Sequence, residues 1–181
     1  MKGKILTRTI LEREIFIYLP NGYDISDKKY PVVYAHDGDK FIKFLGGIID
    51  EIEEGFMNES LEEHILVGVT PFDRLNEYTP WAAKANHERF HDFEGEGDKY
   101  LEFLTNDLQD YIEKEFKVSS NKKDRKVIGH SLGALISLYS VFKNNNYSKV
   151  ASICASQWYD KWIQFIKKEK LINDDFKLII I

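Results

Sequence analysis

Hydrophobic positions along the chain switch repeatedly between the period of a β-strand and the period of an α-helix. Apolar runs predict strands at 31–36, 64–70, 126–128, 149–156 and 176–181. Alternation over 5–19 predicts a further β segment, which ends at the turn residues Pro20, Asn21 and Gly22. Helical spacing predicts helices at 39–57, 100–116 and 132–142, and a helical stretch from Trp158. Strands that alternate with helices, and that are apolar throughout, predict an α/β fold with a doubly wound, mostly parallel sheet.

Two stretches modify this prediction. Gly46 and Gly47 fall inside the helix predicted at 39–57 and weaken the expectation that it is unbroken. The run 176–181 has the apolar composition of a central, buried strand. Because chain termini usually lie at the protein surface, we expect the natural polypeptide to continue beyond Ile181.

The composition is that of one globular domain, which we place at residues 1–181 and expect to be incomplete at its C-terminal end. Hydrophobic residues make up 43% of the chain and the formal net charge is -5. No basic stripe interleaved with aromatic residues occurs, so we expect no nucleic-acid partner. The first ten residues lack the apolar segment of a signal peptide, and no apolar run approaches the length of a membrane span. We therefore expect a cytoplasmic protein without a membrane partner.

The single cysteine, Cys154, lies in the apolar run 150–155. One cysteine cannot form a disulfide or a thiolate cluster within the chain. We predict that Cys154 is a small, buried core residue.

The most informative segment is 125–134, which reads Arg-Lys-Val-Ile-Gly-His-Ser-Leu-Gly-Ala. It places Ser131 between Gly129 and Gly133 at the G-x-S-x-G spacing, after a predicted strand and before a predicted helix. In a nucleophile elbow, this spacing lets a sharp turn present the serine, while the two glycines let neighbouring backbone approach closely. The N–H of Leu132 would lie at a helix N-terminus, where it can stabilise an oxyanion. The alternative is an ordinary strand-to-helix turn in which Ser131 caps the helix.

Together with the elbow, further motifs resemble the putative-esterase branch of the α/β hydrolases. This branch includes enterochelin-type siderophore esterases, S-formylglutathione hydrolases and mycolyltransferases, and the resemblance spans most of the chain. The strand 31–35 and the following His-Asp-Gly-Asp, residues 36–39, resemble the family's strand and D-G loop. The resemblance implies that the backbone N–H of Asp39 is the second oxyanion donor and that Gly38 gives it room. A carboxylate at this position departs from the commoner neutral residue, and a plain Asp-Gly turn is the alternative.

The segment 74–80, Arg-Leu-Asn-Glu-Tyr-Thr-Pro, is similar to the R-x-x-E-x-T-P segment of the enterochelin-type members. Arg74 and Glu77 are three residues apart, and we expect this pair to brace the loop by a charge-assisted hydrogen bond. Arg74 is alternatively a contact for an anionic or catecholate-rich substrate. Trp158 matches an aromatic position of the family and is either a substrate contact or a packing residue. The long loop 71–98 is a further candidate for substrate contacts.

No cofactor or metal is predicted. His87 and His91, with the acidic residues that follow them, match no named pattern of metal ligands, and the acidic run reads as solvated surface. We expect a small-molecule ester as the binding partner.

The resemblance implies a serine carboxylic-ester hydrolase that works through an acyl-enzyme on Ser131, acting on siderophore-type lactones or small acyl esters. A serine needs a base, and the α/β-hydrolase order is Ser, then acid, then His. All five histidines precede or adjoin Ser131, and none follows it; Asp160 is one candidate acid. We expect the acid and the histidine beyond Ile181, and this chain by itself to be nearly inert. The alternatives are an acyltransferase on the same site and a non-catalytic binding protein.

Overall fold

The structure is a computed structural model that describes residues 1–85, 88 and 91–181. His87, one of the two histidines weighed above as metal ligands, lies outside the described residues. The strands are β1 (Lys4–Ile10), β2 (Arg13–Leu19), β3 (Val32–His36), β4 (Ile65–Val69), β5 (Arg125–His130), β6 (Lys149–Ile153) and β7 (Lys177–Ile180). The helices are α1 (Gly38–Met57), α2 (Arg74–Glu77), α3 (Gly97–Phe103), α4 (Gln109–Glu115), α5 (Leu132–Ser140) and α6 (Trp162–Lys168). Short helical turns are η1 (Tyr23–Ile25), η2 (Leu104–Leu108) and η3 (Lys122–Asp124).

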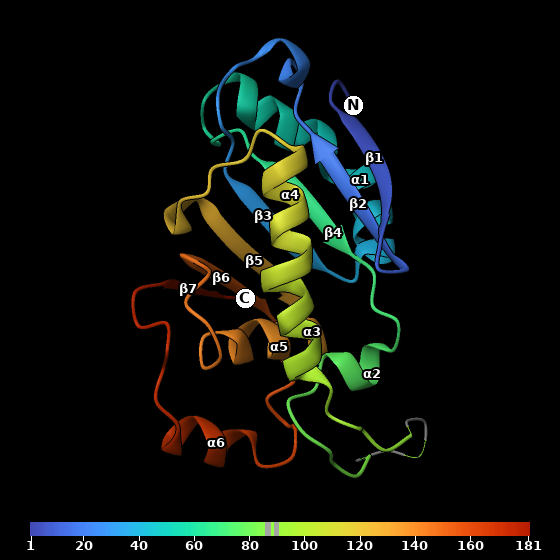
Figure 1. The fold of residues 1–181 in the computed structure, drawn as a ribbon, viewed down its shortest axis with the longest axis vertical. Helices are drawn as coiled ribbons and strands as arrows, with labels where there is room; N and C mark the ends of the chain where they lie inside the picture. The colour runs from blue at the N-terminus through green and yellow to red at the C-terminus, as the bar shows by residue number, and fades with distance from the viewer. Residues whose placement is uncertain (86–87, 89–90) are drawn as a thin grey trace.

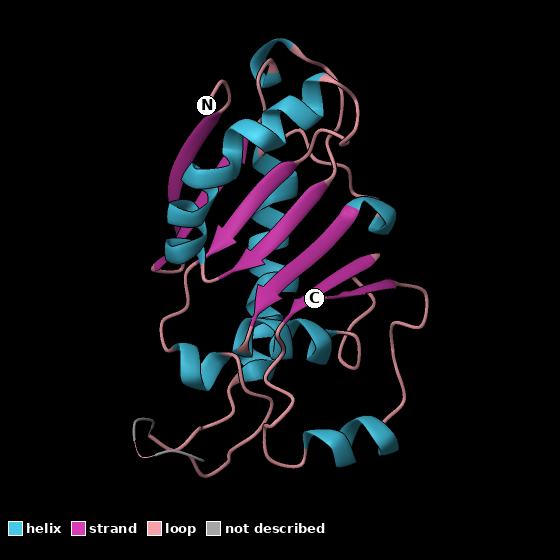
Figure 2. Cartoon of the chain, turned by 180° about the vertical axis from the view of Figure 1, so that it is seen from behind, coloured by secondary structure: helices cyan, strands magenta, loops and turns pink. Residues whose placement is uncertain are grey.

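Within the described residues, the seven strands form one sheet in the order β1-β2-β4-β3-β5-β6-β7. The strands β4, β3, β5, β6 and β7 are parallel, whereas β1 and β2 form an antiparallel hairpin at one edge. Helices lie on both faces: α1 covers one, and α3, α4 and α5 cover the other (Figures 1 and 2). The predicted doubly wound, mostly parallel sheet is confirmed.

The two faces of the sheet have separate cores. The larger core packs α3, α4 and α5 against the sheet and includes Leu101, Ile112 and Leu135. The smaller core lies under α1 and consists of Tyr18, Leu45, Ile49, Phe56 and Leu66. Parallel strands buried on both faces are apolar throughout, which is why the sequence shows runs and not alternation at β3 and β4.

The first β segment is divided by a turn that contains no typical turn residue. The two-residue turn Leu11-Glu12 joins β1 to β2, and both residues have positive φ, 47° and 64°. A two-residue hairpin turn of this shape normally uses Asn-Gly or Asp-Gly. The alternation over 5–19 was predicted correctly, but no turn residue marked the division.

The helix α1 is continuous through Gly46 and Gly47, although these two glycines weakened the prediction of an unbroken helix. A Cβ atom added at either glycine would meet nothing within 4 Å, so both glycines lie on the open side of the helix. The helix is held by Leu45 and Ile49 on its buried side, which outweighs the intrinsic cost of the glycines. The helix predicted over 100–116 is also present, as α3 and α4 joined by the π-helical turn η2.

Two predictions concern the C-terminal third, and one of them, the burial of Cys154, is wrong. The strand β7 pairs with β6 at the edge of the described sheet, and Leu178, Ile179 and Ile180 are 43%, 46% and 65% exposed. The prediction of a central strand concerns the longer natural polypeptide, and it stays a prediction. Cys154 is exposed and not buried, because β6 ends at Ile153 and Cys154 lies in the following turn with φ 47°.

None of the described helices combines the length and the hydrophobicity needed to cross a lipid bilayer.

Candidate active site

Ser131 lies in the sharp turn between β5 and α5, as the G-x-S-x-G spacing predicts. Its backbone has φ 58° and ψ -117°, a conformation that costs a non-glycine residue of the order of 1–3 kcal/mol. A Cβ atom at Gly129 would lie 2.2 Å from the carbonyl carbon and oxygen of Gly133. The turn therefore closes only because position 129 carries no side chain, and its geometry is that of a nucleophile elbow.

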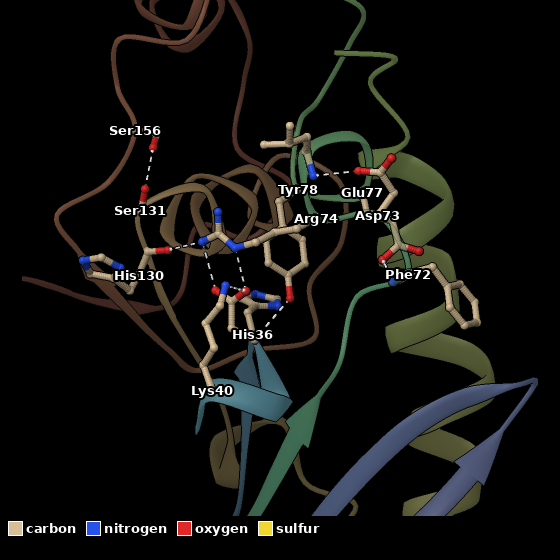
Figure 3. Close-up of polar contacts among 12 residues, drawn as sticks. His36, Lys40, Phe72, Asp73, Arg74, Glu77, Tyr78, His130, Ser131 and Ser156 are labelled. Carbon is tan, nitrogen blue, oxygen red and sulfur yellow. Dashed lines mark hydrogen bonds and ion pairs between the residues drawn. The ribbon is translucent and has the colours of Figure 1, made fainter. Parts of the chain in front are cut away.

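The Ser131 hydroxyl contacts a second serine that the sequence reasoning missed. Its Oγ lies 3.1 Å from Oγ of Ser156, a residue that is 2% exposed (Figure 3). The backbone closes the same contact, because Ser131 N donates to Ile153 O at 2.9 Å and Ser156 N donates to Ser131 O at 3.2 Å. The carboxyl ends of adjacent parallel strands meet at one edge of the sheet. Because β5 and β6 are adjacent and parallel, this rule could have predicted that residues after β6 lie close to Ser131.

The two predicted oxyanion donors lie at the starts of two helices at this edge. Leu132 is the first residue of α5, and Asp39 is the second residue of α1. Backbone N–H groups in a first helical turn have no acceptor within the helix, so they remain free for an external anion. A Cβ atom at Gly38 would lie 2.6 Å from the carbonyl carbon of Gly68 in β4, which explains the glycine before Asp39. The catalytic roles of Ser131, Leu132 and Asp39 stay predictions.

The predicted pairing between Arg74 and Glu77 is wrong. Arg74 instead pairs with Asp37, the residue before α1: Nε donates to Oδ1 at 2.6 Å and Nη2 donates to Oδ2 at 2.9 Å (Figure 3). Nη2 also donates to the carbonyl oxygen of His130 at 3.2 Å. Arg74 thus braces a loop as predicted, but its partners come from two other strand ends that sequence spacing does not reveal.

Glu77 has a different partner, the buried Arg13 of β2. Arg13 Nη1 and Nη2 donate to the two carboxylate oxygens at 2.8 and 2.5 Å, and Phe72 N donates to Oε2 at 3.1 Å. The Arg13 guanidinium also lies 4.1 Å from the ring centroid of Phe72. This pair ties the start of the 71–98 loop to the sheet and is structural.

The electrostatics of the site follow from burial and from these ion pairs. Burial by itself would raise the pKa of the Asp37 carboxyl, but Arg74 and Lys40 outweigh it and hold that pKa below its usual range. Burial lowers the pKa of His36 to about 4, so this histidine is neutral at physiological pH. Its Nδ1 lies 2.9 Å from the Tyr100 hydroxyl.

The histidines that the structure describes do not pair with Ser131. His36 is held by Tyr100, the ring of His64 is hydrogen-bonded to Glu62 O, and the ring of His91 is hydrogen-bonded to Asp92 O. The His130 side chain points away from the Ser131 hydroxyl in Figure 3. Among the described residues, no three His, Cys, Asp or Glu side chains converge in a group that could hold a metal ion.

Trp158 lies just after Ser156 and is 50% exposed. Its ring centroid is 6.2 Å from that of Phe93 and 6.3 Å from that of Tyr159. These aromatic residues line a cavity of about 430 Å³, together with Lys84 and Asp160. Residues of the 71–98 loop and of the segment after β6 thus line one cavity. It lies beyond the sheet edge that carries the elbow, because the segment after β6 leaves the sheet at that edge.

Comparison with known proteins agrees with this architecture. A family model described as Putative esterase matches residues 8–173. The chain is 36% identical over 161 residues to the uncharacterized protein YbbA of Bacillus subtilis (strain 168), covering 88% of this chain and 63% of YbbA. The structure of an IroE-like serine hydrolase from Shewanella oneidensis superposes with a TM-score of 0.85 at 22% identity, covering 98% of this chain and 60% of that chain.

A second solved structure, the siderophore hydrolase EstA from Aspergillus nidulans, superposes with a TM-score of 0.74 at 17% identity, covering 99% of this chain and 68% of that chain. These likenesses confirm the α/β-hydrolase type of fold. The chain spans 63% of the length of the curated relatives that it matches.

Proposed function

This chain belongs to the putative esterase family, and we propose that the protein containing it is a serine carboxylic-ester hydrolase with Ser131 as nucleophile. The observation that carries the proposal is the strained conformation of Ser131 between two glycines in contact, at the start of α5. A serine that merely capped a helix would need neither the strain nor the close approach of Gly129 to Gly133.

In the proposed reaction, Ser131 Oγ attacks the ester carbonyl carbon, and the hydroxyl proton passes to a base. The carbonyl oxygen becomes an oxyanion that the N–H groups of Leu132 and Asp39 stabilise. The tetrahedral intermediate collapses, the bond to the alcohol oxygen breaks, and the alcohol leaves with a proton. Water then hydrolyses the acyl-enzyme and restores the serine. The base is not assigned to a residue of this chain.

The substrate class that we propose is a siderophore-type lactone or a small acyl ester. The siderophore class is suggested by the structurally similar EstA, a siderophore hydrolase. The half-exposed Trp158, whose ring packs beside the buried Phe93, offers aromatic surface in the cavity. Aromatic surface of this kind favours a substrate with an apolar or aromatic body.

The test is labelling of the full gene product with a fluorophosphonate probe, read by intact mass. We expect one adduct, mapped to Ser131 by peptide analysis and absent from Ser131→Ala. Ser140→Ala is the matched control, because Ser140 is a buried serine in the helix that follows Ser131 and its hydroxyl donates to Ser137 O. We expect Ser140→Ala to label like the wild type. Absence of any adduct on the correctly folded wild type would overturn the esterase and favour a binding protein.

Product analysis then separates a hydrolase from an acyltransferase. The full gene product is incubated with a p-nitrophenyl ester, or with a trilactone siderophore, in the presence and absence of a competing alcohol. A hydrolase releases free acid in both cases, whereas an acyltransferase transfers the acyl group to the alcohol.

A further inference from the structure

Arg74 connects two turns that belong to different strands. Its guanidinium holds both carboxylate oxygens of Asp37, which follows β3, and the carbonyl oxygen of His130, the last residue of β5 (Figure 3). The Asp37 side chain is only 11% exposed, and that of Arg74 is 25% exposed. A planar guanidinium can bridge three oxygens in this way because its N–H groups are fixed in one fork.

The two turns are otherwise not tied together by the sheet. The β3–β5 ladder has its last partners at Ala35 and Ile128, so Asp37 and His130 lie beyond the end of the pairing. Asp37 is further constrained by a left-handed backbone, φ 57°, and by its N–H, which donates to the Tyr78 hydroxyl at 2.8 Å. Arg74 is thus the described side chain that bridges these strand ends.

Each bridged residue is two positions before one of the predicted oxyanion donors. Asp37 precedes Asp39, and His130 precedes Leu132. A shift of one turn relative to the other would change the separation of the two N–H groups, and a misplacement of about 1 Å can cost about 100-fold in rate. The contacts of Arg74 therefore restrain the distance between the two N–H groups, on which stabilisation of an oxyanion depends.

Charge adds a second effect. The carboxylate Oδ2 of Asp37 lies 3.6 Å from the position of a Cβ atom at Gly133, so a negative charge sits beside the elbow. An uncompensated carboxylate there would oppose a developing oxyanion. The Arg74 guanidinium compensates that charge at both carboxylate oxygens, whereas the more exposed Lys40 contacts only Oδ1.

We propose that Arg74 is a positioning residue that clamps the turn after β3 to the elbow and so fixes the Asp39 and Leu132 N–H groups relative to each other. This inference rests on the proposed esterase function. It differs from a substrate contact, because the clamp acts equally on charged and uncharged esters.

The test compares four variants of the full gene product: Arg74→Gln, Arg74→Lys, Asp37→Asn and the double variant Arg74→Gln with Asp37→Asn. The matched control is Lys40→Gln, which removes the other cation near the same carboxylate, a 62% exposed side chain 3.2 Å away, and leaves the His130 contact in place. Kinetics use a neutral p-nitrophenyl ester and an anionic ester of the same acyl group. Folding of every variant is checked by circular dichroism.

With either ester, we expect Arg74→Gln to lower kcat by about 10-fold to 100-fold with little change in KM. Arg74→Lys restores only part of the rate, because an ammonium cannot bridge all three oxygens. The double variant is faster than Arg74→Gln alone, because it also removes a carboxylate that, without Arg74, only the exposed Lys40 would partner. Lys40→Gln stays near the wild-type rate. A change confined to KM for the anionic ester would overturn the clamp and assign Arg74 to substrate binding.

A second readout does not depend on activity. We expect hydrogen exchange of the peptides containing Asp39 and Leu132 to accelerate in Arg74→Gln and not in Lys40→Gln. Unchanged exchange in Arg74→Gln would overturn the clamp even if the wild type is labelled at Ser131. Accelerated exchange in a protein that is never labelled would support the clamp and overturn the esterase, so the two failures are distinguishable.

Discussion

The hydroxyl oxygens of Ser131 and Ser156 lie 3.1 Å apart, so the candidate nucleophile is hydrogen-bonded to a buried serine from the neighbouring strand's loop. The hydrogen bond holds the Ser131 side chain in one orientation at the turn after β5. Ser156 is thereby part of the candidate site, although no motif pointed to it.

Ser156→Ala should slow fluorophosphonate labelling of Ser131 by about fivefold, because a hydrogen bond of about 1 kcal/mol that orients the nucleophile is lost. Ser152→Ala is the control: Ser152 is equally buried in β6, and its hydroxyl has no hydrogen-bond partner among the described residues. We expect Ser152→Ala to label at the wild-type rate. Equal rates for both variants would remove Ser156 from the site.

Glycine-to-alanine substitutions should have opposite effects at two positions. Gly129→Ala should lower the free energy of unfolding by about 1–3 kcal/mol or more, because its Cβ atom would lie 2.2 Å from Gly133 backbone. Gly46→Ala should raise it by about 1 kcal/mol, because the site is open and alanine favours the helix. Urea denaturation of the full gene product checks both values. Destabilisation at position 46 would contradict the continuous helix α1.

The buried pair between Arg13 and Glu77 should be sensitive to the loss of one partner. Glu77→Gln leaves an uncompensated guanidinium that is 5% exposed, and we expect a loss of about 3–5 kcal/mol in the free energy of unfolding. Replacing both partners, as Arg13→Met with Glu77→Leu, should recover most of that loss. Lys99→Ala, in the exposed pair with Glu96, should leave stability unchanged within error. A small effect of Glu77→Gln would argue against the buried pair.

His36 should remain neutral down to about pH 4, because burial lowers its pKa from 6.5 to about 4. An unfolded histidine takes up its proton near pH 6.5, so between these two values the unfolded chain holds more protons than the folded one. Stability should therefore fall by roughly 3 kcal/mol as the pH is lowered through this window. The pH dependence of urea denaturation measures this loss, and an NMR titration of the His36 ring measures its pKa.

His36→Gln removes this titration and should flatten the loss of stability between about pH 6.5 and about pH 4. An unchanged slope in a folded His36→Gln variant would assign the pH dependence to other groups.

The local pattern of the sequence was sufficient for the main elements of the fold. Apolar runs located β3, β4, β5 and β6, and helical spacing located α1, the α3–α4 segment and α5. These elements are predictable because the period of buried positions follows directly from backbone geometry. The Leu11-Glu12 turn was not predictable, because neither residue is of a type that marks a hairpin turn.

The candidate site divides in the same way. Gly129, Ser131 and Gly133 lie within five residues, so the sequence by itself determined the elbow: only glycine fits where backbone atoms approach at contact distance. The partners of Arg74, Glu77 and Ser131 were decided by tertiary structure alone. Asp37, Arg13 and Ser156 are 37, 64 and 25 residues away from them. Asp37 and Ser156 follow the carboxyl ends of parallel strands, which meet at one edge of the sheet. Arg13 reaches the same edge because it begins β2, which runs antiparallel to β4. Hydrogen bonds and ion pairs depend on distances of a few ångströms, and such distances between remote residues exist only after the chain has folded.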